Sequence, residues 1–85
     1  MIRKINQPVA VTVFFDGSTQ RILPKNIIWN DNSYPVNKVG LHHTYKVGQN
    51  LFHIFTVQSR YLAFRLKLDT QSLSWTLEEI SDGLS

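Results

Sequence analysis

A chain of 85 residues that is 42% hydrophobic has room for one compact domain and for no second core. It contains no cysteine, which excludes disulfides, and no apolar run long enough for a signal sequence or a membrane span. The formal charge of +3 favours anionic partners, and we expect a cytoplasmic protein. We expect one domain over residues 8–80, between short tails at residues 1–7 and 81–85.

Short runs in which β-branched and aromatic residues alternate with polar ones predict an antiparallel meander of about six strands. Residues 8–15 place four apolar side chains on one face: Val9, Val11, Val13 and Phe15. Residues 16–19 then supply the turn to a second strand, which ends near Trp29. A run of turn-forming residues, 30–33, brings Trp29 close to Tyr34 on the next strand.

The apolar positions change from even to odd numbers between Val36 and Leu41. A bulge at Gly40 inserts the extra residue that this change requires and bends the strand. We therefore expect one long, bent strand from Tyr34 to Val47. This bend favours a small, partly open all-β barrel, and a two-sheet sandwich is the alternative.

Three further hairpins are expected, with turns at residues 48–50, 59–60 and 69–72. In the first of them, Tyr45 lies opposite His53. The three registers give one continuous inward face, which predicts the core: Leu41, Val47, Leu51, Phe55, Val57, Leu62, Phe64, Leu66, Leu68, Leu73, Trp75 and Leu77.

No motif of a hydrolase, a nucleotide-binding loop or a metalloenzyme is present, so we expect no enzyme activity, no cofactor and no metal. Glu78 and Glu79 are neighbours on a predicted strand and would face opposite ways, which argues against a carboxylate pair. His43 and His53 are diagonal neighbours in the expected register, but no third ligand accompanies them. We expect these histidines to be packed or to lie at the rim of the sheet.

The outward face of the sheet carries the candidate binding site. Phe52 and Tyr61 are the expected stacking residues, and Lys46, Arg65 and Lys67 are the expected phosphate contacts. Single-stranded nucleic acid binds sheet faces of this kind by stacking its bases on rings. The surface is therefore predicted to be a non-catalytic nucleic-acid-binding site, bordered by His42 and Arg60.

Two other interpretations of this face remain open. The N-terminal hairpin could cover Phe52 and Ile54, with Arg65 paired diagonally to Glu78, so that the face has no binding role. Alternatively, the exposed aromatic residues could form a protein–protein or self-association surface.

Three segments carry a resemblance: Trp29 with Tyr34-Pro35-Val36, residues 53–57 and residues 64–80. In these segments the chain resembles a family of small, uncharacterised bacterial all-β proteins, which implies a shared fold and no site residues. The tryptophan hairpin and Trp75-Thr76-Leu77-Glu78 are also similar to a domain appended to some bacterial lesion-bypass polymerases. That similarity implies a role near nucleic acid.

Overall fold

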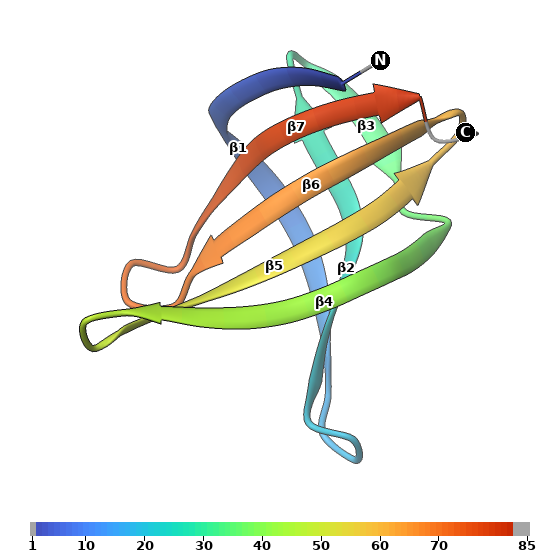
Figure 1. The fold of residues 1–85 in the computed structure, drawn as a ribbon. Helices are drawn as coiled ribbons and strands as arrows, with labels where there is room; N and C mark the ends of the chain where they lie inside the picture. Colours follow the sequence, from blue (N-terminus) through green and yellow to red (C-terminus); the bar gives the residue numbers. More distant parts are fainter. Residues whose placement is uncertain (1, 83–85) are drawn as a thin grey trace.

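The computed structural model describes residues 2–82, which form one sheet of seven antiparallel strands in the order β3-β2-β1-β7-β6-β5-β4 (Figure 1). The strands are β1 (Ile2–Asp16), β2 (Arg21–Trp29), β3 (Asn32–Pro35), β4 (Lys38–Val47), β5 (Asn50–Ser59), β6 (Leu62–Asp69) and β7 (Ser74–Asp82). The all-β prediction is confirmed, and a single sheet replaces the alternative of a two-sheet sandwich. No helix that could span a membrane occurs among residues 2–82.

The sheet is curled because its two edge strands are neighbours in the sequence. Only Val36 and Asn37 separate β3 from β4, although these strands lie at opposite ends of the strand order. The Val36 N–H donates to the Lys25 carbonyl on β2 at 2.9 Å, and the Asn37 N–H donates to the Gln58 carbonyl on β5 at 2.7 Å. This corner therefore draws β2 and β5 together and makes the sheet a partly open barrel.

The long, bent strand expected from Tyr34 to Val47 is present as β3 and β4, with its sharpest change at the corner between them. The predicted bulge at Gly40 is confirmed, because the β4–β5 register shifts between Val39 and His42. Counted in this way, the seven strands are the six of the predicted meander, with the bent strand divided in two.

The first strand is longer than the sequence predicted. β1 begins at Ile2, and its first part, residues 2–9, pairs with β7, so the expected N-terminal tail is part of the sheet. Residues 10–16 pair instead with β2. At the other end, Ser81 and Asp82 belong to β7, and the rest of the expected C-terminal tail lies outside the described residues.

The core lies inside the curl and is formed mainly by β5, β6 and β7 with one residue of β2. Its buried members are Ile27, Phe55, Val57, Phe64, Leu66, Leu77 and Ile80. Five of these seven were predicted, whereas Ile27 and Ile80 were not. Three predicted core residues are exposed instead: Leu41 by 70%, Val47 by 63% and Leu73 by 73%.

Turn length accounts for the two errors on β4. The β4–β5 turn contains two residues, Gly48 and Gln49, and Gly48 has the positive φ of 62° that such a turn favours. Tyr45 therefore lies opposite Phe52 rather than His53. A shift of one residue reverses the face of every side chain in a strand, so Val47 leaves the predicted core.

The next two hairpins also differ from the expected registers. The β5–β6 turn is formed by Arg60 and Tyr61, so both strands move by one residue and the inward face is preserved. In the β6–β7 hairpin, Leu68 pairs with Trp75, which leaves Leu73 in the turn at a φ of 60°. A solvent-exposed turn position explains why Leu73 is not part of the core.

Two leucine substitutions test this account of the core. Leu66 is fully buried, so Leu66→Ala should lower the free energy of unfolding by about 2 to 5 kcal/mol through the cavity it leaves. Leu73→Ala removes the same atoms from the surface and should change it by less than about 0.5 kcal/mol. Urea denaturation of both variants measures the difference, and equal losses would contradict the β6–β7 register.

Candidate nucleic-acid interface

The face of the sheet opposite the core carries an aromatic cluster that is formed by Tyr45, Phe52 and Lys67, here called the outer aromatic cluster. Tyr45 on β4 and Phe52 on β5 are direct cross-strand partners, and their rings stack at a centroid distance of 5.2 Å with 20° between the planes. The Lys67 ammonium of β6 lies 5.4 Å from the Phe52 ring centroid, within cation–π range. The cluster therefore spans three neighbouring strands.

The order of these groups across the sheet leaves one ring accessible. Phe52, on the middle strand, has Lys67 on its β6 side and Tyr45 on its β4 side. Because β4 is an edge strand, no strand follows Tyr45 in the sheet, and Tyr45 is 39% exposed. A flat ligand can thus extend the stack at Tyr45.

The N-terminal hairpin does not cover this face. β1 and β2 lie behind β4, β5 and β6, on the side of the core (Figure 1). Ile54, on the outer face between His43 and Lys67, is nevertheless only 2% exposed, and Phe52 is half-buried. The predicted pairing of Arg65 with Glu78 is present, with a distance of 3.0 Å between Nε and Oε1.

The structure brings together only part of the predicted site. Phe52 and Lys67 are in the outer aromatic cluster, and Arg65 follows on the same face of β6. Lys46 pairs with Leu51 and so lies on the opposite face, contrary to the prediction.

Tyr61 is also remote from the cluster. It lies in the β5–β6 turn, nine residues along the chain from Phe52, which is roughly 30 Å of extended strand. The predicted border residue Arg60 shares this turn, and its guanidinium lies 5.6 Å from the Tyr34 ring centroid. The expected patch of five residues is therefore reduced to Phe52, Arg65 and Lys67.

Sequence reasoning missed Tyr45 because the β4–β5 turn was taken as one residue too long. Gly48 directly after the β-branched Val47 was the available signal, since glycine at the first position suits a two-residue turn. The expected three-residue turn placed Tyr45 on the inner face of the sheet.

Two β-bulges meet at Glu78, on the part of the outer face nearest β1. Arg65 pairs with Glu79 while Leu66 pairs with Leu77, so Glu78 has no partner on β6. On the other side of β7, Ile5 and Asn6 of β1 together face Glu78 in a second bulge, which gives β1 one extra residue there. Bulges redirect side chains, which explains the arrangement of the two glutamates.

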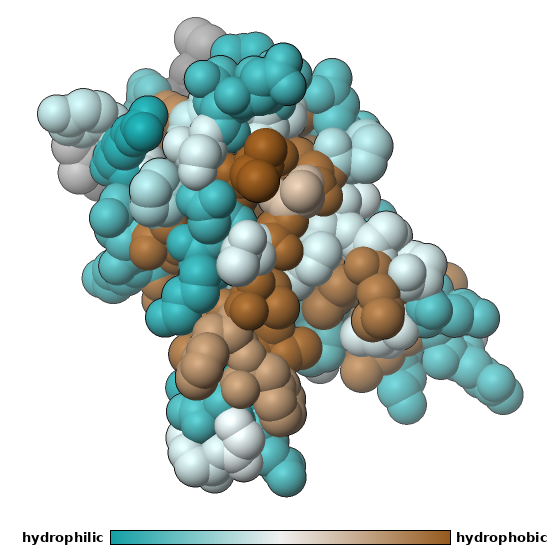
Figure 2. All heavy atoms as spheres, turned by 180° about the vertical axis from the view of Figure 1, so that it is seen from behind, coloured by the Kyte–Doolittle hydropathy of each residue, from teal (hydrophilic) through white to brown (hydrophobic). Residues whose placement is uncertain are grey.

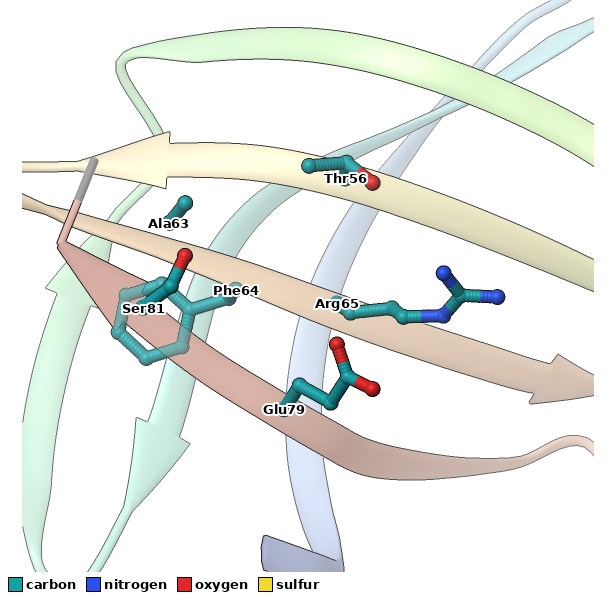
Figure 3. A pocket seen from close by; sticks show the side chains of 6 residues that line it. All are labelled: Thr56, Ala63, Phe64, Arg65, Glu79 and Ser81. Carbon is teal, nitrogen blue, oxygen red and sulfur yellow. The ribbon is translucent and has the colours of Figure 1, made fainter. Parts of the chain in front are cut away.

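Glu78 and Glu79 line the same surface pocket, contrary to the prediction that they face opposite ways. This polar pocket has a volume of about 300 Å³ and is lined by Lys4, Asn6, Arg65, Glu78 and Glu79. A smaller depression of about 90 Å³ adjoins it, because Arg65 and Glu79 line both. Figure 3 shows Arg65 from β6 and Glu79 from β7 side by side in this depression, with Thr56 and Ser81 at its borders.

On the inner face, two histidines meet beside the core. His42 Nε2 and His53 Nδ1 are 2.8 Å apart, and the His42 ring stacks on Phe55 at 4.2 Å between centroids. The predicted diagonal neighbour of His53 was His43, and the corrected β4 register explains the change. The described residues contain no group of three or more His, Cys, Asp or Glu side chains placed to share a metal ion.

The β1–β2 hairpin carries an apolar surface of its own. In the view from behind, hydrophobic side chains continue from the middle of the molecule onto the hairpin that projects from it (Figure 2). Val13, Phe14 and Phe15 of this hairpin are 42%, 53% and 59% exposed. The Lys25 ammonium lies 5.9 Å from the Phe14 ring centroid.

Comparison with known proteins found no matching family model, no similar curated protein and no similar solved structure. The resemblances noted from the sequence therefore stay predictions.

The histidine pair gives a pH prediction. Burial lowers the pKa of both rings below the ordinary value of 6.5. The pKa of His42 is lowered further by the positive charges of His53, Arg21 and His43. The unfolded chain therefore binds protons more readily, and the free energy of unfolding should fall as the pH drops below about 6.5, until the lowered pKa is passed. Melting temperatures between about pH 7.5 and pH 5.5 measure this loss.

A double variant, His42→Gln with His53→Gln, should flatten this pH dependence, whereas His43→Gln removes only the smallest of the causes that lower the pKa of His42 and should retain most of it. Asp16 and Asp69 do not interfere, because their carboxyl pKa values are lowered from 3.8 by hydrogen bonds in their turns and their contribution is lost only in stronger acid. An unchanged pH dependence in the double variant would assign the effect to other groups.

Proposed function

We propose that this protein is a non-catalytic module that binds single-stranded nucleic acid through the outer aromatic cluster, in the cytoplasm. The observation that carries the proposal is the stack of Tyr45 on Phe52, which ends at an exposed ring on an edge strand. Every base has a π-face, so such a platform accepts bases of any sequence.

The charges near the cluster support an anionic ligand. The Lys67 ammonium lies over Phe52, where it can meet a phosphate beside a base stacked on Tyr45. Two of the nearby acidic groups are engaged: Arg65 binds Glu78, and the Asp69 carboxylate accepts the Gln71 N–H at 2.9 Å. The positive charge of Lys67 is therefore available to a ligand, in a chain with a formal charge of +3.

Fluorescence titration of a labelled oligothymidylate of about 12 nucleotides tests the proposal. Tyr45→Ala should weaken binding about 5- to 150-fold, the equivalent of ~1 to 3 kcal/mol for one stacked base. Lys67→Gln should also lower the slope of log affinity against log salt by about 0.7, the value for one phosphate contact on a single strand.

Tyr61→Ala is the matched control, since this tyrosine is 77% exposed and far from the cluster. It should leave the affinity unchanged. Equal losses for Tyr45→Ala and Tyr61→Ala, or affinity that does not depend on salt, would contradict binding at the outer aromatic cluster.

The projecting β1–β2 hairpin favours a second candidate function, self-association. Val13 and Phe15 share one face of this hairpin near its turn and are 42% and 59% exposed. Exposed apolar patches on small domains commonly form protein interfaces, and a second copy of the chain is the partner we propose. This surface is distinct from the outer aromatic cluster, so the two functions can coexist.

Phe15→Lys tests self-association. If copies of the chain meet through the hairpin, the mean mass of the protein measured by light scattering should rise with concentration, and this rise should disappear in Phe15→Lys. Leu73→Lys places the same charge on another exposed apolar residue and should behave like the original protein. A constant monomer mass for the original protein would remove this candidate.

A further inference from the structure

The polar pocket on the outer face is formed by the two bulges that meet at Glu78. Asn6 has a positive φ of 52°, a conformation that asparagine tolerates better than most residues, and it lies in the bulge where β1 carries one extra residue opposite Glu78. The matching bulge on β7 places Glu78 and Glu79 in one pocket with Lys4. The pocket therefore depends on both ladders being interrupted at the same point.

Two of the charged groups in the pocket are already satisfied, because Arg65 and Glu78 bind each other. Within residues 2–82, no hydrogen bond or ion pair holds the Glu79 carboxylate. Glu79 can therefore offer two acceptor oxygens to a ligand, and Lys4, its direct cross-strand partner on β1, can offer a donor.

This combination matches one base. The Watson–Crick edge of guanine presents an acceptor, O6, followed by two donors, N1–H and the 2-amino group. A carboxylate accepts from both donors, and an ammonium donates to O6. The corresponding edges of adenine, cytosine and thymine place an acceptor where guanine has a donor, and that acceptor would face the carboxylate.

We propose that the pocket of Lys4, Asn6 and Glu79 selects a guanine base in the bound strand. This inference rests on the proposed function, which it extends from general binding to base selection. Arg65 lines the pocket and is two residues from Lys67, roughly 7 Å along the same face of β6. The pocket is centred on β7, which lies three β-strand spacings, or roughly 14 Å, from β4 across the sheet. A nucleic-acid chain that stacks on Tyr45 and passes Lys67 thus reaches the pocket.

The test compares oligothymidylates of about 12 nucleotides that carry guanine, adenine or hypoxanthine at one central position. The guanine oligonucleotide should bind about tenfold more tightly than the adenine one, within the range for a bidentate base contact. Hypoxanthine lacks the 2-amino group and should bind with intermediate affinity.

Glu79→Gln should remove the preference for guanine and leave the affinity for plain oligothymidylate largely unchanged. Asp31→Asn removes the same charge in the distant β2–β3 turn and should retain the preference. Equal affinities for guanine and adenine in the original protein would overturn the pocket assignment alone. Absence of binding to every oligonucleotide at low salt would overturn both this assignment and the proposed function.

Discussion

The architecture depends on a two-residue corner. Val36 and Asn37 join the two edge strands of a seven-stranded sheet, so the sheet can exist only in a curled form. The Asn37 side chain strengthens this corner, since its Oδ1 accepts the Arg60 N–H at 2.8 Å while its own N–H donates to Gln58. Curling brings β2 against β5, β6 and β7 and buries the core in a domain that has no disulfide to stabilise it. It also turns the opposite face of β4, β5 and β6 outward, where the outer aromatic cluster lies.

The sequence predicted the strands, the bend at Gly40 and most of the core, because alternation of apolar and polar residues reports which residues share a face. It did not predict the register of strand pairing, because register depends on turn lengths and on bulges, which the alternation of apolar and polar residues does not reveal. The β5–β6 hairpin moved by one residue on each strand, so Phe55 and Phe64 stayed in the core. The β4–β5 turn was one residue shorter than expected, and this single difference exchanged the faces of Tyr45 and Lys46.

Phe52 and Lys67 meet on one face because both belong to strands whose faces were assigned correctly. The carboxylate pocket was not predictable, since neighbouring residues share a face only where a bulge interrupts the strand, as it does at Glu78 and Glu79. Across β4 to β1, the outer face therefore presents a stacking ring, a cation and a polar pocket in sequence. Together they form a strip suited to a flexible, anionic chain that carries flat bases.

Binding at the outer aromatic cluster is tested most directly by mapping the binding surface with nuclear magnetic resonance, using isotope-labelled protein and a guanine-containing single-stranded oligonucleotide. If the strand binds at the outer aromatic cluster, the amide signals of Tyr45, Phe52, Lys67 and Glu79 should shift together as the oligonucleotide is added, while those of Tyr61 and the β1–β2 hairpin stay in place. Shifts confined to the hairpin or to the inner-face residues His42 and Lys46 would contradict it, because they would place the ligand away from the outer aromatic cluster.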